Sequence, residues 1–462
     1  MHGRSNIARQ ADVVIAGAGI AGVSTAFHLA AGFGVGRVVL CDPRPPLTLT
    51  SDKSTECYRN WWPGPGSAMV DLMNRSIDLL ETWADESDNV FHLSRRGYLY
   101  VTADPHRLAD MQREAREINA LGAGELRVHR GTAEDPVYQE AAPDGYRNAA
   151  RGADLFTDGD SLRRQFPYIS TNAVGGLHAR RAGWFSAQQL GAWLLDRARS
   201  AGAELVVDSV VEVDTAGGRV GSVRLASGAS IKTPHFVNAA GPLVGEVGTL
   251  TGVDLPVFSE VHRKISFADS RSAVPRTAPM LIWNDPQMID WTDEERAGLL
   301  ADSALAHLVE RLGAGAHCRP EGSKDAATVL GLWEYRTDVR APTFPIPEDP
   351  LYPEIVMRGL ATMVPPLGEY LERLPRPFID GGYYTKTREN RPLIGPAGPE
   401  GSVVVGALSG FGVMAAAAAG ELGAIHVTGG SLPDYARWFE PGRYEDPEYL
   451  ALLGQMTDSG QI

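Results

Sequence analysis

Cysteine is scarce in this sequence of 462 residues. The three cysteines, Cys41, Cys57 and Cys318, lie far apart, and none belongs to a C-x-x-C pair. This spacing excludes a disulfide-stapled fold and gives no indication of a zinc site or a redox-active dithiol. We therefore expect no bound metal ion and a reducing, cytoplasmic location.

Long apolar runs and clusters of basic side chains are lacking too. The N-terminal arm is polar and has no signal-peptide core, and the Ala- and Gly-rich stretch 413–423 is too short to cross a membrane. The formal net charge of -14 repels nucleic acid and anionic lipid. We expect neither a membrane nor a nucleic acid as partner, and the oligomeric state stays open.

The composition is otherwise that of an ordinary globular protein, with 44% hydrophobic and 22% charged residues and no internal repeat. A chain of this length exceeds the usual size of one domain. We therefore predict two structural domains.

The clearest motif lies near the N-terminus. Residues 11–17 form an apolar run typical of a strand that is buried on both faces. The run ends in a turn with Gly17, Gly19 and Gly22, and residues 23–30 then have helical periodicity. In such a turn the glycines allow a tight bend, close approach of a pyrophosphate and close packing of helix on strand. The start of the helix then attracts the phosphates.

An acidic residue completes this motif. Residues 37–41 form a second apolar strand that leads into Asp42, about 20 residues after the last glycine. A carboxylate there accepts hydrogen bonds from both ribose hydroxyls and disfavours a ribose phosphate. A glycine turn without a ligand is the simpler alternative, but the complete arrangement predicts a dinucleotide site. The motif alone does not distinguish FAD from NAD.

Segments far apart in the chain together resemble the D-amino acid oxidase and sarcosine oxidase group of flavoproteins. The resemblance spans most of the chain and implies an enzyme that binds FAD. Its pieces are the glycine turn, SDKSTECYR at 51–59, the helix and strand at 183–213, VNAAGP at 237–242, GGYYTKTRENRPLIGP at 381–396 and GALSGFGVM at 406–414.

The resemblance also implies which residues hold FAD. In that family a helix that opens like Gly410-Phe411-Gly412 points its N-terminus at the flavin, where its partial positive charge stabilises the reduced ring. The match to the family valine that meets adenine is Val211, and small residues such as Gly241 permit backbone contact. The implied cofactor contacts are Gly17, Gly19, Ile20, Ala21, Gly22, Asp42, Ser51, Ser54, Thr55, Val211, Ala240, Gly241, Gly410, Phe411, Gly412, Val413 and Met414.

We expect FAD to be bound without a covalent link. The family cysteine that attaches flavin aligns near Gly382, so the usual cysteinyl link cannot form there. Cys57 lies close to the place where related dehydrogenases attach flavin through a histidine, and it is the alternative attachment point. Most buried cysteines are simply small apolar side chains.

Three residues are implied on the substrate side. Arg59 ends a T-x-x-x-R run like that of the family arginine that holds a substrate carboxylate, for which a guanidinium offers two parallel bonds. A surface or ion-paired arginine is the alternative. Tyr384 matches a family tyrosine beside the substrate, and His317 falls where a further group faces the ring; a core position is the alternative for both. Met414 replaces the partnering lysine of the family, which weakens the case for an amino acid substrate.

Several aromatic residues could line a substrate pocket, and one position is informative about the electron acceptor. Trp61 and Trp62 follow the Arg59 loop, and we expect Trp333 to approach from an opposite strand, unless these rings only pack between domains. Val329 takes the place of the lysine that activates oxygen in oxidases of the group. The acceptor is therefore either molecular oxygen or another compound.

Residues 291–313 are predicted to form one amphipathic helix, either a lid or a packing element. Thr292 and Glu295 have the spacing of a capping box, and leucines recur at helical intervals up to Leu312.

These features predict an FAD-dependent oxidoreductase that oxidises a C–N bond of a small amine or amino acid by hydride transfer to flavin N5. Three alternatives stay open. One is a flavin oxidase or dehydrogenase of a bulkier natural-product or hydroxy substrate, the second is a flavin-binding subunit without catalysis, and the third is a nicotinamide-dependent dehydrogenase.

The predicted fold class is α/β, with a Rossmann-type FAD-binding domain interleaved with an α+β substrate domain that contains a mixed or antiparallel sheet. We expect the FAD-binding domain to comprise residues 1–90, 153–255 and 377–435, the substrate domain residues 91–152 and 256–376, and a C-terminal tail residues 436–462.

Overall fold

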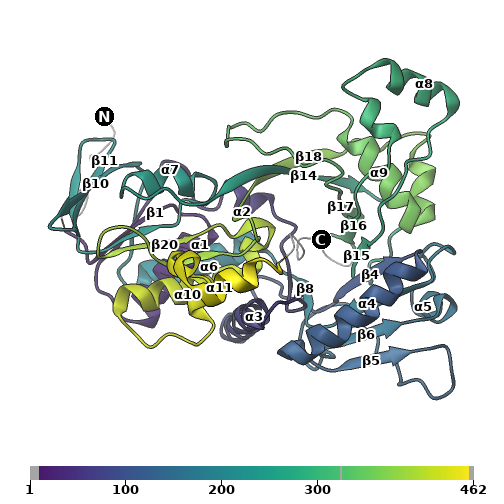
Figure 1. The fold of residues 1–462 in the computed structure, drawn as a ribbon, viewed down its shortest axis with the longest axis horizontal. Helices are drawn as coiled ribbons and strands as arrows, with labels where there is room; N and C mark the ends of the chain where they lie inside the picture. Colours follow the sequence, from purple (N-terminus) through teal and green to yellow (C-terminus); the bar gives the residue numbers. More distant parts are fainter. Residues whose placement is uncertain (1–9, 323–324, 457–462) are drawn as a thin grey trace.

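The computed structural model describes residues 10–322 and 325–456, which form two lobes, each built on its own sheet (Figure 1). The polar arm at 1–9 and the end of the tail at 457–462 lie outside the described residues. The first sheet has the order β19, β20, β13, β1, β2, β9, with the bounds Leu393–Pro396, Ser402–Gly406, Phe236–Asn238, Val13–Ala16, Val38–Cys41 and Glu204–Val206. All neighbours pair in parallel except β19 and β20.

Burial on both faces explains the apolar runs of this sheet. Val13 and Ile15 point into a core shared with helices, whereas Val14 and Ala16 point into a core shared with a three-stranded sheet. The predicted strand, turn, helix and second strand are thereby confirmed. The helices are α1 (Ile20–Phe27), α3 (Ala68–Glu86), α6 (Ala187–Ser200) and α10 (Gly412–Thr428), and the small sheet is β10 (Val210–Ala216), β11 (Arg219–Leu225) and β12 (Ser230–Lys232).

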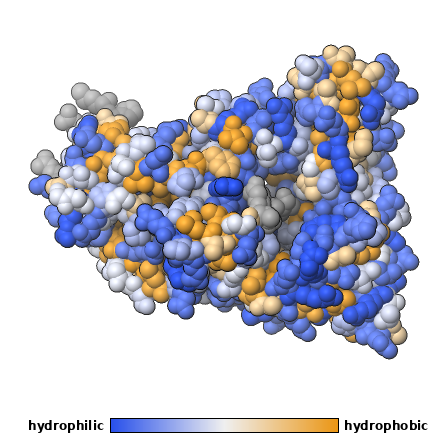
Figure 2. Space-filling model, viewed as in Figure 1, coloured by the Kyte–Doolittle hydropathy of each residue, from blue (hydrophilic) through white to orange (hydrophobic). Residues whose placement is uncertain are grey.

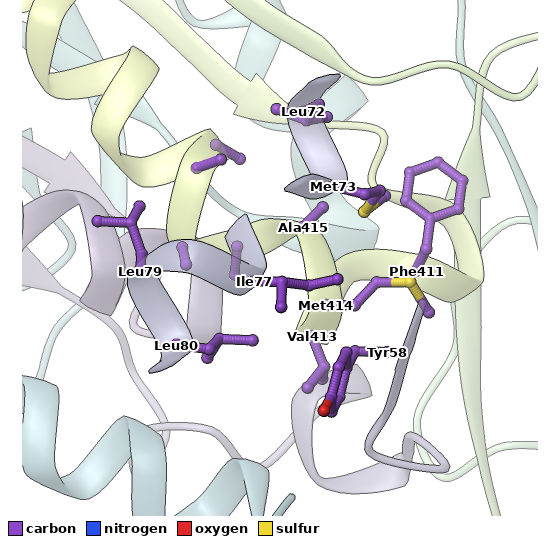
Figure 3. Close-up of a cluster of buried hydrophobic side chains, with 14 of the residues drawn as sticks. Tyr58, Leu72, Met73, Ile77, Leu79, Leu80, Phe411, Val413, Met414 and Ala415 are labelled. Atoms are coloured by element: carbon purple, nitrogen blue, oxygen red, sulfur yellow. The ribbon is translucent and has the colours of Figure 1, made fainter. Parts of the chain in front are cut away.

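Helix α10 is apolar on all sides because it lies inside this lobe. Figure 3 shows Met73 and Ile77 of α3 close to Met414 and Ala415 of α10. By length and composition Ser409–Thr428 is the one segment of the described chain that passes as a membrane span, yet 72% of its apolar window is buried in the fold. Such all-round apolarity is typical of a core helix.

The second sheet has nine strands and is mixed, as expected. Its order is β18 (Phe378–Lys386), β14 (Phe258–Ala268), β17 (Thr328–Leu332), β16 (Ala316–Pro320), β15 (Met280–Trp283), β4 (Tyr98–Thr102), β7 (Gly175–Ala179), β6 (Ala153–Phe156) and β5 (Leu126–His129). The pairs β15 with β4 and β5 with β6 are parallel, and the other pairs are antiparallel.

The sheets divide the chain at different residues from those expected. Strands β6, β7 and β18 lie in the segments 153–255 and 377–435, which we assigned to the FAD-binding domain, but they pair within the nine-stranded sheet. Strand pairing between distant segments decides this division. Two short strands, β3 (Cys57–Arg59) and β8 (Ala182–Trp184), belong to neither large sheet and form a separate antiparallel pair.

The prediction of one helix over residues 291–313 is wrong beyond Ala301. The capping box of Thr292 and Glu295 is present and begins α8 (Asp293–Ala301). Asp302 then accepts a hydrogen bond from the backbone of Ala304, which closes a turn, and the chain continues in a 3-10 turn. Leu308 and Leu312 are buried but Leu300 is 56% exposed, so helical spacing of the leucines indicated neither uniform burial nor one continuous helix. The remaining helices are α2 (Thr50–Lys53), α4 (Pro105–Ile118), α5 (Gly159–Gln165), α7 (Val244–Thr249), α9 (Tyr352–Met363) and α11 (Pro447–Leu453).

The segment that follows α10 is anchored to the fold as far as α11. Glu389, in the loop between β18 and β19, accepts hydrogen bonds from Arg443, Tyr444 and Tyr449 at 2.7–2.8 Å. On the face shown in Figure 2, apolar residues lie in small groups between polar ones, and α4 presents a polar surface. This is an ordinary distribution for a globular protein.

Candidate active site

A first cavity opens where β1, β2 and β13 end, the edge of a parallel α/β sheet at which ligands bind. Residues from the N-terminal motif, the loop after β2, the turn after β13 and the start of α10 meet in its wall. The predicted cofactor residues that line it are Gly17, Gly19, Ile20, Ala21, Asp42, Ser51, Ser54, Ala240, Gly241, Gly410, Gly412 and Val413.

The three motif glycines have different local surroundings. A Cβ on Gly17, whose φ is +105°, would overlap the carbonyl oxygen of Ala239, and a Cβ on Gly22 would overlap that of Gly17. These two glycines are required by backbone packing. A Cβ on Gly19 would meet only the Ser51 hydroxyl, at 3.4 Å, so this residue keeps the turn open toward the cavity.

The polar groups of this cavity fit the dinucleotide FAD. The Asp42 carboxylate accepts hydrogen bonds from the backbone N–H groups of Ala18 and Arg44, both at 2.9 Å, and is thereby fixed at the wall where a ribose would bind. Ser51 Oγ accepts from the Ile20 backbone N–H at 3.0 Å, beside the N-terminus of α1. Helix α10 adds a second N-terminus, whose partial positive charge suits a reduced flavin.

Other predicted cofactor residues lie elsewhere. Thr55, Phe411 and Met414 line a second cavity, and Gly22 lies behind the glycine turn. Val211, on β10 and 39% exposed, is outside the residues that line either cavity.

Cys57 is not among the residues that line either cavity. It is buried and donates a hydrogen bond to the Thr55 carbonyl at 3.3 Å. Burial raises the pKa of this thiol, which disfavours the thiolate. The structure thus gives no support for a covalent link at Cys57.

The second cavity adjoins the first, and Tyr384 and Gly410 line both. The structure brings the three predicted catalytic residues together in its wall although they are far apart in sequence. The lining residues are Thr55, Arg59, Trp62, Tyr98, Glu260, His262, Gly315, His317, Leu332, Glu334, Thr337, Tyr384, Lys386, Gly410, Phe411 and Met414.

Arg59 is held between aromatic rings at the end of β3. Its guanidinium carbon lies 4.4 Å from the centre of the Trp62 ring and 5.5 Å from that of Tyr98, and its Nε donates to the Trp61 carbonyl at 3.2 Å. Both contacts are within the range of cation–π interactions. A planar guanidinium suits a carboxylate because it can form two parallel N–H···O bonds.

His317 and Tyr384 have fixed orientations. The His317 Nδ1–H donates to the Gly315 carbonyl at 2.7 Å, and burial lowers the pKa of His317 to about 4, so the ring is neutral near pH 7 with its lone pair on Nε2. Tyr384 stacks on His262 with 3.8 Å between ring centres. A Cβ on Gly410 would overlap the Tyr384 ring, so only glycine lets the start of α10 approach this ring.

A polar cluster of Glu260, His262, Glu334 and Lys386 was not predicted. Glu260 Oε2 lies 2.8 Å from Lys386 Nζ and 3.4 Å from His262 Nε2, and His262 Nδ1 lies 3.5 Å from Glu334 Oε1. Burial opposes ionisation of Glu260, but hydrogen bonds from His262 and Lys386 lower its pKa, whereas burial raises the pKa of Glu334. The alternation of polar and apolar residues in β14 was the available signal, but alternation alone equally predicts a solvent-facing side.

The expectation for Trp333 is wrong. Its side chain is fully buried in the second core and donates to the Gly313 carbonyl at 2.9 Å, while its neighbours Leu332 and Glu334 face the cavity. Successive residues of an extended chain point to opposite sides, which explains this placement. Val329 is likewise buried in the second core.

The fold and the two adjoining cavities define a class of protein. A Rossmann-type lobe with a dinucleotide site, and a second sheet that encloses a polar cavity beside it, are the parts of a two-domain flavin oxidoreductase. The family model described as FAD dependent oxidoreductase, DAO, matches residues 12–424. The chain belongs to this family of FAD-dependent enzymes.

Solved structures share the fold across nearly the whole chain, whereas no curated protein matches the sequence. L-proline dehydrogenase from P. horikoshii is 18% identical with a TM-score of 0.72, and the match covers 95% of this chain and 99% of that one. Glycine oxidase from Geobacillus kaustophilus is 16% identical, with a TM-score of 0.69 and coverages of 92% and 96%. Iminodiacetate oxidase from Chelativorans sp. BNC1 is 19% identical, with a TM-score of 0.67 and coverages of 93% and 98%.

Proposed function

We propose that this enzyme oxidises the C–N bond of an amine or amino acid that carries a carboxylate. The observation that carries the proposal is the position of Arg59, a buried cation in the wall of a cavity that joins the cofactor cavity at Tyr384 and Gly410. A carboxylate on Arg59 would hold the rest of a small substrate near this junction. The names of the similar structures, which mention L-proline, glycine and iminodiacetate, support the same substrate class.

The residues of the cavity would orient the substrate and exclude water. Bound FAD supplies the acceptor for a hydride from the carbon next to nitrogen. The neutral His317 can accept an N–H through Nε2, and the rings of Trp62, Tyr98 and Phe411 shield the site. The substrate nitrogen must be unprotonated, because its lone pair assists departure of the hydride. Water then hydrolyses the resulting imine.

A bulkier or hydroxy substrate is the second candidate. Met414 stands in the cavity wall where the resemblance implies a lysine, so the site has one cation fewer for a carboxylate. An apolar wall formed by Met414, Phe411 and Trp62 would suit a larger side chain.

An anaerobic absorbance titration tests both candidates. The purified FAD-loaded protein is mixed with L-proline, glycine, iminodiacetate, the bulkier N-benzylglycine and the hydroxy acid L-lactate. Bleaching of the visible flavin band by L-proline, glycine or iminodiacetate supports the proposal, and bleaching only by N-benzylglycine or L-lactate favours the second candidate. A flavin that is reduced by dithionite but by none of these compounds contradicts both. Reoxidation in air then identifies whether oxygen is an acceptor.

A further inference from the structure

Two carboxylates face the two ring nitrogens of His262 in the substrate cavity. Glu260 approaches Nε2 at 3.4 Å and Glu334 approaches Nδ1 at 3.5 Å. All three side chains line the cavity, and all three lie close to Tyr384. On β14 the imidazole of His262 stacks on the ring of Tyr384, which lies on the neighbouring strand β18.

This arrangement can take up one proton. A neutral imidazole has one N–H and one lone pair. With its hydrogen on Nε2, directed at Glu260, the ring presents its Nδ1 lone pair to an oxygen of Glu334. One further proton between Nδ1 and Glu334 turns this contact into a charge-assisted hydrogen bond.

We propose that His262 and Glu334 together form the base that removes the proton from the ammonium group of the substrate. The inference rests on the proposed function and adds a catalytic residue pair to it. An N–H bond of the ammonium breaks, its electron pair stays on the substrate nitrogen, and the proton is bound between His262 Nδ1 and Glu334 Oε1. Lys386 holds Glu260, and Glu260 orients the ring. The amine is thus neutral before the hydride leaves.

The kinetic test uses His262→Asn and Glu334→Gln in the FAD-loaded enzyme. The rate of anaerobic flavin reduction is measured by stopped flow from pH 6 to about 10, the range up to the pKa of an alkylammonium. The probes are L-proline, glycine and iminodiacetate. We expect both variants to be slowed about 100-fold at pH 7, a typical contribution of a general base. The deficit should disappear near pH 10, where the amine binds already neutral.

Controls separate a base from a structural residue. His106→Asn, on the exposed side of α4, and Glu354→Gln, on α9, should keep the wild-type pH profile. Variants that are equally slow at every pH would show a structural role and overturn the inference. So would variants that keep the full rate at pH 7. If no amine bleaches the wild type, the proposed function fails instead.

A second measurement does not depend on turnover. Histidine ring signals of the oxidised, FAD-loaded protein are followed by NMR over pH, with the His262 signal assigned by its loss in His262→Asn. Removal of the Glu334 charge takes away an anion that favours the imidazolium. The His262 titration in Glu334→Gln should therefore move to lower pH than in wild type. An unchanged titration would overturn the coupling between the two residues.

Discussion

The two cavities of this enzyme adjoin each other but are built in different ways. The cofactor cavity is lined largely by backbone and small residues, such as Gly17, Gly19 and Ala240, at the ends of parallel strands. The second cavity is lined by large or charged side chains, such as Arg59 on β3 and Glu334 just after β17, which belong to different sheets or to the loops beside them. In the proposed function, a dinucleotide would thus be recognised by the shape of the main chain, whereas the substrate would be selected by side chains.

Because of this difference, we expect the two cavities to respond differently to amino-acid substitutions. Backbone-built sites fail when a side chain intrudes, because neither neighbouring main chain can move away. Sites built from side chains lose one interaction at a time and keep the fold. The predictions below test this contrast from the largest expected effect to the smallest.

The largest effect is expected from Gly17→Ala. The added methyl group would overlap the Ala239 carbonyl, and the residue would be held at a positive φ. We expect at least a tenfold loss of bound FAD, measured as the ratio of flavin to protein absorbance after purification. Gly221→Ala is the matched control, since its Cβ would meet only the Asp214 carbonyl at 3.7 Å. Equal flavin content in both variants would contradict the prediction.

Arg59→Lys tests the substrate cavity without disturbing the first. Lysine keeps the charge but lacks the planar group that lies against Trp62 and Tyr98. We expect normal FAD content and roughly a 100-fold fall in kcat/KM for a carboxylate substrate, equivalent to about 2.7 kcal/mol. The matched carboxamide should be nearly insensitive to the substitution. An equal fall for both compounds would show that Arg59 does not bind the carboxylate.

The smallest expected effect is a loss of folding stability at low pH, caused by His28 in the nucleotide-binding lobe. Burial lowers the pKa of His28 from 6.5 to about 4, and its Nε2–H donates to the Ala417 carbonyl of α10 at 3.1 Å. Below pH 6.5 the unfolded chain therefore binds a proton that the folded chain does not, so stability is retained above pH 6.5 and lost toward pH 4. From pH 7 to pH 5 this loss is about 2 kcal/mol.

His28→Gln isolates that contribution, because glutamine can donate to the same carbonyl without titrating. The melting temperature of the variant should fall less than that of wild type between pH 7 and pH 5, as measured by differential scanning calorimetry. FAD content at pH 7 should be the same in both. A parallel fall in the two proteins would remove His28 as the cause.

Much of the cofactor side could be predicted from sequence. The strand, glycine turn, helix and acid up to Asp42 are contiguous, and each has a local physical reason for its residue types. The start of α10 and the turn at Ala240 were found by resemblance to a family, since nothing local indicates that they meet the N-terminal motif. The expected role of Val211 stays a prediction.

The sequence by itself determined the nucleotide motif and the buried strands beside it, because these depend on short-range spacing and backbone shape. It also indicated a flavoprotein family, through the order of several motifs along the chain. Only the tertiary structure decided that Glu260, His262 and Glu334 line the same cavity as Arg59, and that Trp333 is buried in the second core instead. The physical reason is that the face of a strand becomes a site or a surface according to what packs over it, and distant chain segments determine that packing.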